Sequence, residues 1–440
     1  MHDVGLLRRA IARYFKGTPI RLRGKRNRGA SAIVTALASN NSAILVINTG
    51  SSSVKFALFD AASDLRRLFA GALERIGLPL ARFHAMDTAG SIFFDEEVTL
   101  PDHREALRRL IRVSQEKLGG KALLAVGHRV VHGGPDCDCP LPVTRELEAR
   151  LKRLIPMAAL HQPHNLAGIS AVREIAPHLL QIACFDMAFH HRLPRIAQLL
   201  SLPREYQTHE IRRYGFHGLS YEYAIEALRE RGVDIEKERI IVAHLGNGAS
   251  MCAIKHGQSV ETTMGFSTLA GLMMGTRTGD LDPGAILYLM TEKGMTTEAM
   301  QHLLYERSGL LGVSGISSNM RELLGRGDNR AAREAIELFC YRARSCLAAL
   351  TTVLGGLDRL VFTGGIGANA SEIRERICDG LDYLGIELDA AANSAGAGTI
   401  STPKATVTVQ ALASDEERMI ARHVLRFAAD RALVQEASHL

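Results

Sequence analysis

AILVINTGSSSVKFALFD, residues 43–60, is the stretch that decides the fold of this chain. Two runs rich in β-branched and aromatic residues flank a short polar turn, which is the pattern of a strand, a tight turn and a second strand. The design recurs about 200 residues later in IIVAHLGNGASMCAIK, residues 240–255. Two such units in one chain predict a duplicated architecture.

The segments between and after these units alternate between strand-like and helical patterns. Residues 123–131 and 181–185 have strand character, whereas residues 220–231 and 329–354 have helical periodicity. This alternation predicts an α/β protein built from two related halves. A chain of 440 residues is also too long for one hydrophobic core of typical size. We expect domains at 43–187 and 188–416 with a cleft between them, and a C-terminal helix, 417–440, that joins the first domain.

The net charge of +6 is concentrated at the N-terminus. Residues 1–42 contain nine Lys and Arg residues and one acid, Asp3, so the rest of the chain is slightly acidic. This distribution argues against a basic core that binds nucleic acid. The segment resembles a transit peptide in its abundance of arginine, and a disordered basic tail, or an upstream stretch that is seldom translated, would have the same composition.

Hydropathy and cysteine content indicate a cytoplasmic protein without a membrane partner. No apolar run approaches the ~18 residues of a membrane span, and the N-terminus lacks the apolar centre of a secretory signal. The seven cysteines show no metal-ligand pairing and fit a reducing compartment. Cys137-Asp138-Cys139 is predicted to be a surface loop, because no histidine or second cysteine pair stands nearby to complete a metal site.

Three glycine-rich turns are candidates for binding phosphate. In the first, around Ser51 and Ser53, backbone N–H groups and hydroxyls could surround a phosphate while Lys55 supplies positive charge. The second turn, residues 246–250, is similar, and two facing hairpins could hold the phosphate tail of a nucleotide from both sides. A hairpin with ordinary polar turn residues explains either turn alone.

The third candidate is a strand-like run that enters a glycine loop, residues 363–370, before a helical segment at 371–378. It imitates the dinucleotide fingerprint through the spacing of Gly365, Gly367 and Ala370. The position near the C-terminus leaves no room for the rest of a doubly wound domain, so a loop for the adenosine or phosphate part of a nucleotide is predicted. The chain contains no GxxxxGK[ST] motif.

Two arginines stand in glycine-flanked segments. Arg129 lies at a strand end before Gly133, and Arg277 lies in the turn MGTRTGDLDPG, residues 274–284. Phosphoryl transfer and carboxylate binding both need planar cations with several donors, which arginine provides. The alternatives are a satisfied surface charge for Arg129 and a clamp on Asp280 or Asp282 for Arg277.

Acids and histidines supply further candidates. Asp186 follows an apolar strand-like run, where ligand groups of α/β sheets gather, and is a credible magnesium ligand. Glu416 stands in a possible capping box with Ser414 as the N-cap and Glu417 three residues later. His161 and His217 could donate hydrogen bonds to a phosphoryl oxygen or could be structural.

Taken together, the motifs INTGSSSVKF, GHRVVHGG, RRYGFHG, AHLGNGAS with MGTRTGDLDPG, and FTGGIG resemble those of the acetate kinase family, in order from about Ile44 to about Arg422. The resemblance implies duplicated ribonuclease-H-like domains of the actin/hexokinase/Hsp70 type with an interdomain cleft. It also implies a homodimer that forms acetyl phosphate from acetate and ATP, reversibly, by direct in-line transfer. Mg²⁺ is the implied metal, and Mn²⁺ could substitute.

The resemblance also implies roles around the acyl substrate. Arg129 and Arg277 would hold acetate and stabilise the transition state. His217 would bind the transferring phosphoryl group with support from His161, and Asp186 would belong with these catalytic groups. The methyl group would be enclosed by Val131, Leu160 and Phe216.

On the nucleotide and metal side, Asp186 and Glu416 would position Mg²⁺ together with Asn48. The residues expected near the phosphates are Asn48, Ser51, Ser53, Lys55, His244, Asn247 and Gly248. Those expected around the adenosine are Asn319, Arg321, Gly365, Ile366, Gly367 and Asn369.

Four positions depart from the family pattern. Asn319 stands where Asp is usual, Ala368 where Glu is usual, Thr268 where Pro is usual and Tyr221 where His is usual. Asn319 and Ala368 put the preference for a particular nucleotide base in doubt. Thr268 puts the preferred length of the acyl chain in doubt. A propionate or butyrate kinase is therefore the nearest alternative, followed by a non-catalytic nucleotide-binding protein. A sugar kinase would need an aspartate base for a hydroxyl, whereas a carboxylate is already ionised.

Overall fold

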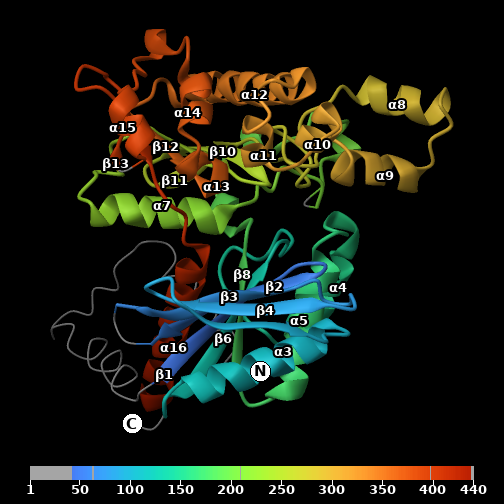
Figure 1. The fold of residues 1–440 in the computed structure, drawn as a ribbon, viewed down its shortest axis with the longest axis vertical. Helices are drawn as coiled ribbons and strands as arrows, with labels where there is room; N and C mark the ends of the chain where they lie inside the picture. The colour runs from blue at the N-terminus through green and yellow to red at the C-terminus, as the bar shows by residue number, and fades with distance from the viewer. Residues whose placement is uncertain (1–41, 62–63, 209, 397, 438–440) are drawn as a thin grey trace.

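The computed structural model describes residues 42–61, 64–208, 210–396 and 398–437. Figure 1 shows two lobes, each built around one β-sheet. The first lobe contains residues 42–186 together with the last helix, and the second contains residues 187–415. Apart from Ser42, the basic segment 1–42 lies outside the described residues.

The first lobe holds an eight-stranded mixed sheet with the order β5-β4-β3-β2-β1-β6-β8-β7. Neighbours from β1 to β5 are antiparallel, whereas β6 lies parallel to β1 and β8 parallel to β6. Its strands are β1 Ser42–Thr49, β2 Ser53–Asp60, β3 Arg67–Glu74, β4 Ala81–Asp87, β5 Ile92–Val98, β6 Ala122–Val130, β7 Leu141–Pro142 and β8 Leu180–Phe185.

Alternate residues of β1 divide the core of this lobe into two layers. Leu45 and Ile47 pack with residues of α3 (His103–Lys117) and α5 (Gln162–Ile175), whereas Ile44 and Val46 pack with Ile420 and other residues of α16 (Glu416–Ala437). This two-residue period is the signature of a strand with both faces covered. The strand that the sequence places first is therefore the centre of the lobe.

The second lobe repeats this arrangement in a six-stranded sheet with the order β11-β10-β9-β12-β14-β13. Strands β9 to β11 form an antiparallel meander, and β12 and β14 continue parallel to β9, just as β6 and β8 continue from β1. The strands are β9 Ile240–Leu245, β10 Ala249–Lys255, β11 Gln258–Thr262, β12 Arg359–Thr363, β13 Gly398–Thr399 and β14 Thr408–Ala411. The predicted duplication and the α/β class are confirmed.

Helices cover both faces of the second sheet. α7 (Gly218–Glu230) packs Tyr221 and Leu228 against β9, and α12 (Arg330–Leu354) packs Phe339 on the opposite face. The other helices are α4 Arg145–Arg153, α6 Arg195–Gln198, α8 Pro283–Thr291, α9 Thr297–Glu306, α10 Gly309–Ser314, α11 Met320–Leu324, α13 Gly364–Asn369, α14 Ser371–Cys378 and α15 Ala390–Ala395. Short 3₁₀ turns are η1 Ile155–Met157, η2 Ala188–His190, η3 Arg204–Tyr206 and η4 Asp382–Leu384.

The elements expected at 123–131, 181–185, 220–231 and 329–354 are confirmed to within two residues as β6, β8, α7 and α12. The expected glycine loop at 363–370 is wrong, because α13 begins there at Gly364. Gly364 has a φ of +77°, and a Cβ at this position would lie 2.6 Å from the carbonyl oxygen of Leu245. Glycine thus lets the chain turn from β12 directly into a helix.

Three smaller expectations need correction. Ser42 begins β1, one residue before the predicted start of the first domain, and the last helix begins at Glu416 instead of residue 417. Cys137 and Cys139 lie in a loop as predicted, with Asp138 exposed, but both cysteine side chains are buried. The predicted boundaries at 187/188 and 416/417 lie where the described chain passes between the lobes, and the division into domains stays a prediction.

Among the described residues, no helix is both long enough and apolar enough to cross a membrane. All seven cysteines are free thiols.

Candidate active site

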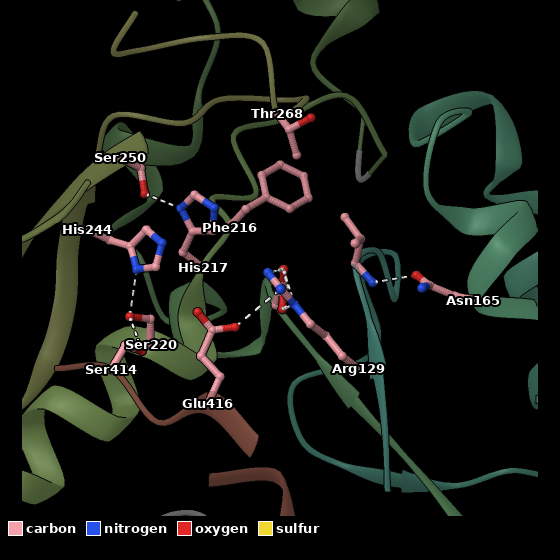
Figure 2. A network of polar contacts seen from close by, with 12 residues as sticks. Arg129, Asn165, Phe216, His217, Ser220, His244, Ser250, Thr268, Ser414 and Glu416 are labelled. Carbon is pink, nitrogen blue, oxygen red and sulfur yellow. Dashed lines mark hydrogen bonds and ion pairs between the residues drawn. The ribbon is translucent and has the colours of Figure 1, made fainter. Parts of the chain in front are cut away.

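Arg129 joins two carboxylates, one buried and one partly buried, where the chain passes between the lobes. Its Nε lies 2.9 Å from Asp186 Oδ1 and its Nη2 lies 2.7 Å from Asp186 Oδ2, while its Nη1 lies 3.3 Å from Glu416 Oε2 (Figure 2). Asp186 directly follows β8, and its whole residue is 2% exposed. Arg129 is therefore not a satisfied surface charge.

The electrostatics of this cluster follow from burial and mutual attraction. Burial alone would lower the pKa of Arg129, but Asp186 and Glu416 raise it above its usual value. For Glu416, burial raises the pKa and the charge of Arg129 opposes that shift. The guanidinium is the group that makes two neighbouring carboxylates tolerable in a buried position.

Glu416 is the first residue of α16, but the helix is not capped as predicted. Oδ1 of Asp415 accepts a hydrogen bond from the N–H of Arg418 at 2.9 Å, whereas Ser414 Oγ lies 3.1 Å from Ser220 Oγ. The expected capping box with Ser414 as the N-cap is wrong, because Asp415 already satisfies the free N–H group of the first turn. Glu416 consequently turns its side chain toward Arg129.

Two histidines stack at the edge of the second lobe. The rings of His217 and His244 have centroids 4.3 Å apart and planes inclined by 28°. Nδ1 of His217 lies 2.8 Å from Ser250 Oγ, and Nδ1 of His244 lies 2.8 Å from Ser220 Oγ (Figure 2). Both Nε2 atoms are therefore free of these serine contacts.

Burial is the main cause that lowers the pKa of both imidazoles. The pKa of His244 falls to about 4, and that of His217 falls well below its ordinary value of 6.5, assisted by His244 and the charge of Arg129. Both rings are neutral near pH 7. A neutral imidazole can still donate a hydrogen bond from whichever nitrogen carries the proton.

Gly248 brings the turn between β9 and β10 against these groups. A Cβ on Gly248 would lie 2.8 Å from Arg277 Nη2 and 3.0 Å from His217 Nε2. Only a residue without a side chain allows this approach. The contact places the second glycine-rich turn, Arg277 and His217 in one site, as the sequence predicts for the phosphate region.

Arg277 is a partly buried cation whose guanidinium is bonded to a backbone carbonyl. Its Nη1 donates to the carbonyl oxygen of Thr268 at 2.9 Å, and no ion pair joins it to an acid within the described residues. Burial lowers its pKa to about 10. Asp280 and Asp282 instead accept hydrogen bonds from the backbone of Gly271 and Gly284. The alternative of a structural clamp is therefore excluded.

The three apolar candidates differ in how deeply they are buried. Val131 and Phe216 are 9% and 1% exposed, and Leu160 is half-buried. His161 is half-buried as well, and burial followed by the charges of Arg277 and Arg129 lowers its pKa to about 4. These effects require His161 to lie near both guanidinium groups.

On the nucleotide side, glycines again allow close contacts. A Cβ on Gly246 would lie 3.9 Å from the N atom of Gly365, and one on Gly275 would lie 2.0 Å from Asn247 Oδ1. Asn319 caps α11 by accepting from the N–H of Arg321 at 3.0 Å, and Asn369 Nδ2 donates to the carbonyl of Gly365 at 2.9 Å. Arg321 and Gly365 are exposed, and Ile366 is partly buried beside the buried Gly367.

The first hairpin contains the candidates Asn48, Ser51, Ser53 and Lys55, of which Lys55 acts electrostatically on Glu416. Ser51 and Lys55 are exposed, and Asn48 and Ser53 are partly exposed. The charge of Lys55 lowers the pKa of Glu416 against the larger effect of burial. That the two hairpin turns face each other across a bound nucleotide stays a prediction.

The sequence did not single out Asn165, which ties the first turn to the acyl region. Its Oδ1 accepts from the N–H of Val131 and its Nδ2 donates to the carbonyl of Thr49, both at 3.1 Å. Ser220 and Ser250, the partners of the two histidines, were also missed. A usable signal existed, because Asn165 lies one helical turn after His161 and Ser220 lies three residues after His217.

Comparisons with known proteins agree with this arrangement. The model of the acetokinase family matches residues 43–422. The acetate kinase of Rhodopseudomonas palustris strain TIE-1 is 50% identical over 394 residues, covering 88% of this chain and 98% of that protein. The acetate kinase of Methylocella silvestris is 47% identical over 393 residues, covering 87% and 97%.

Solved structures show the same relationship. The crystal structure of Porphyromonas gingivalis acetate kinase matches with a TM-score of 0.80 at 38% identity, covering 88% of this chain and 99% of that one. A propionate kinase from Francisella tularensis matches with a TM-score of 0.81 at 35% identity, covering 87% and 98%. A family model that covers the two lobes and relatives of this identity lead to one conclusion: the chain belongs to the acetokinase family.

Proposed function

We propose that this chain is an acetate kinase, which transfers the γ-phosphoryl group of ATP to a carboxylate oxygen of acetate and forms acetyl phosphate and ADP reversibly. The observation that carries the proposal is Arg277. A partly buried arginine without an acidic partner among the described residues, set against Gly248 and His217, is unfavourable unless an anion binds it.

The residues support transfer by alignment and charge neutralisation. Acetate is already ionised at neutral pH and needs no general base. Arg129 and Arg277 would hold its carboxylate and the equatorial oxygens of the moving group, where charge spreads in the transition state. His217 would donate to the same oxygens, and His161 would support the arginines. Val131, Leu160 and Phe216 would exclude water around the methyl group.

The donor set also fits Mg²⁺. Asp186, Glu416 and Asn48 offer the hard oxygen ligands that this ion prefers, usually with phosphate and water oxygens completing the shell. Oε1 of Glu416 has no hydrogen-bond or ion-pair partner among the described residues, since Arg129 contacts Oε2. No group of three or more His, Cys, Asp and Glu side chains in that part of the chain could hold a metal alone. A bound Mg²⁺ would supply charge neutralisation of the nucleotide phosphates, and Mn²⁺ could substitute.

ATP would lie along the glycine-rich turns. Ser51, Ser53 and Lys55 would contact phosphates from the first lobe, and His244, Asn247 and Gly248 would do so from the second. Asn319, Arg321, Gly365, Ile366, Gly367 and Asn369 would surround the adenosine. The exposure of Arg321 and Gly365 supports a site open to a large ligand.

One assay tests the proposal. Purified protein would be incubated with ATP and Mg²⁺ and with acetate, propionate, butyrate or glucose; ADP formation would be measured for every acceptor, and acyl phosphate would be trapped with hydroxylamine. We expect acyl hydroxamate from acetate, and loss of product when EDTA removes the metal. Product from glucose alone, or no turnover of any acid, would contradict the proposal.

A propionate kinase is the second candidate, because Thr268, whose carbonyl binds Arg277, stands where the family usually has proline. A higher kcat/KM for propionate than for acetate in the same assay would favour it.

We also propose that the chain is a cytoplasmic homodimer. Seven free cysteines are consistent with a reducing compartment. On α8, Leu287 and Tyr288 are 62% and 53% exposed, which suits an apolar surface that a second copy covers. Light scattering after size-exclusion chromatography measures the mass, and a monomer at micromolar concentration would refute the dimer.

A further inference from the structure

We propose that Tyr221 and Ser250 are positioning residues that hold the proton of His217 on Nε2, so that this histidine presents a hydrogen-bond donor to the transferring phosphoryl group. The inference rests on the proposed function for the identity of the group that receives the hydrogen bond. The direction of the proton is argued from this chain's own contacts.

The three side chains form a buried relay that leads away from the site. The hydroxyl of Tyr221, on α7, bonds to Ser250 Oγ, on β10, and Ser250 Oγ lies 2.8 Å from His217 Nδ1. Tyr221 and Ser250 are 0% exposed and His217 is 8% exposed. Figure 2 shows Ser250 and His217 joined in this way. Water therefore has little access to the relay.

Counting hydrogens fixes the direction of the relay. Tyr221 and Ser250 each have one hydroxyl hydrogen, and Ser250 Oγ is the only partner of the Tyr221 hydroxyl among the described residues. When Tyr221 donates to Ser250 and Ser250 donates to Nδ1, both hydrogens have acceptors. If Nδ1 carried the proton and donated to Ser250, one of the two hydroxyl hydrogens would be buried without an acceptor, which native structures avoid.

The second histidine of the stack shows that this direction is not automatic. Nδ1 of His244 contacts Ser220 Oγ, which contacts Ser414 Oγ at 3.1 Å. Ser414 is only partly buried, so its hydroxyl can donate to solvent or accept from it. Either direction satisfies that chain. The fully buried end of the relay at Tyr221 is what distinguishes His217.

The consequence lies at Nε2, on the side of Gly248 and Arg277. Because His217 is neutral, only one of its nitrogens carries a hydrogen. With Nδ1 occupied as an acceptor, Nε2–H points into the site. The opposite tautomer would present a lone pair to phosphoryl oxygens and repel them.

Tyrosine suits this role at a position where the family usually carries histidine. Burial raises the pKa of Tyr221 well above its ordinary value, so the phenol keeps its hydrogen at neutral pH. A histidine at this position could donate or accept, depending on its own tautomer. Tyr221 makes the relay run in one direction.

The test is a direct observation of the His217 tautomer. Protein labelled with ¹⁵N-histidine would be studied by two-bond ¹H–¹⁵N correlation, with the His217 signals assigned by their loss in His217→Ala. The expected wild-type pattern has a protonated Nε2 and an unprotonated Nδ1. A protonated Nδ1 in the wild-type protein would overturn the proposal whatever the variants do.

Two variants and a control then connect the tautomer to turnover. In Tyr221→His, whose imidazole can accept a hydrogen bond from Ser250 as well as donate one, and in Ser250→Ala, which removes the donor to Nδ1, we expect the His217 signals to move toward the Nδ1-protonated form. We expect kcat to fall on the order of tenfold, the population shift that one hydrogen bond can impose, with KM for acetate unchanged. Tyr214→Phe is the matched control, because it removes another buried tyrosine hydroxyl, bonded to the carbonyl of Glu210, and should change neither readout.

Unchanged tautomer and kcat in both Tyr221→His and Ser250→Ala would refute the positioning role. If the wild-type protein phosphorylates no carboxylate, the proposed function fails, but the spectrum of its His217 still decides the direction of the relay. The two failures are therefore distinguishable.

Discussion

Replacing Arg129 and Arg277 separately with alanine should lower activity in both variants but change stability in opposite directions. We expect kcat to fall by about 10²–10³ in each, the loss typical of one transition-state donor. The sequence alone predicts the same outcome for both, with an intact fold. The structure separates the two residues by their partners.

For Arg129→Ala, the loss of stability follows from the two carboxylates left behind. The side chains of Asp186 and Glu416 are 3% and 16% exposed, and their ion pairs to Arg129 measure 2.7 and 3.3 Å. Breaking a buried pair by removing one partner costs about 3–5 kcal/mol, because a charge remains without compensation. The free energy of unfolding should therefore fall by about that amount.

For Arg277→Ala, we expect the free energy of unfolding to rise instead of fall. Burial lowers its pKa from 12.5 to about 10, so burying the charge costs the folded state about 3 kcal/mol. The variant also loses the hydrogen bond to Thr268, which destabilises its folded state by about 1 kcal/mol and offsets part of that gain. The ligand-free variant should be more stable than wild type by up to about 2 kcal/mol.

The measurement is equilibrium urea unfolding of ligand-free protein alongside steady-state kinetics. Arg330→Ala is the matched control, because Arg330 forms a surface pair with Glu334 at 2.7 Å with its side chain 86% exposed. It should change stability by less than about 1 kcal/mol and leave kcat unaltered. Equal destabilisation of the Arg129 and Arg277 variants, or a wild-type unfolding midpoint for Arg129→Ala, would refute this account.

Three further predictions follow from the acyl pocket, the basic tail and the buried histidines. Acetate should have the highest kcat/KM, with a value about 10- to 200-fold lower for propionate and lower still for butyrate. Val131→Ala should raise kcat/KM for propionate. A wild-type preference for either longer acid would overturn this order. Deleting residues 1–41 should leave the melting temperature and specific activity nearly unchanged, and a large loss of either would show a structural role. Burial lowers the pKa of three histidines, His128, His132 and His190, from 6.5 to about 4. Between pH 6.5 and pH 4 the unfolded chain therefore binds more protons than the folded protein does, so the free energy of unfolding falls as the pH drops through this range. Each should cost about 2 kcal/mol at pH 5, and equal urea midpoints at pH 7 and pH 5 would contradict this.

The sequence predicted the parts of the fold that depend on local pattern. Continuous apolar runs ending in glycine and serine marked both hairpins, because a buried strand must be apolar and a tight turn needs small polar residues. It misjudged α13, since a run of glycines has no helical periodicity and only the carbonyl of Leu245, from another strand, shows why Gly364 must turn there. It also misjudged Cys137 and Cys139, whose burial depends on distant packing.

The candidate residues could be named from motifs, but their partners could not. Nothing in the spacing of Arg129, Asp186 and Glu416 reveals that one guanidinium contacts both acids, because Glu416 is 287 positions after Arg129 in the numbering and meets it only when α16 returns to the first lobe. Asn165 and Ser250 were missed for the same reason. Each is a single polar residue whose importance lies in what the fold brings to it.

In the described part of the chain, two segments pass from one lobe to the other, directly after β8 and directly before α16. Asp186 stands at the first crossing and Glu416 at the second, and Arg129 links them. If one lobe rotates against the other, the rotation axis passes through these two crossings. Points on an axis move least during a rotation. The carboxylates would then keep their spacing through each rotation, while groups far from the axis, such as those on α8 in Figure 1, would move through a larger arc.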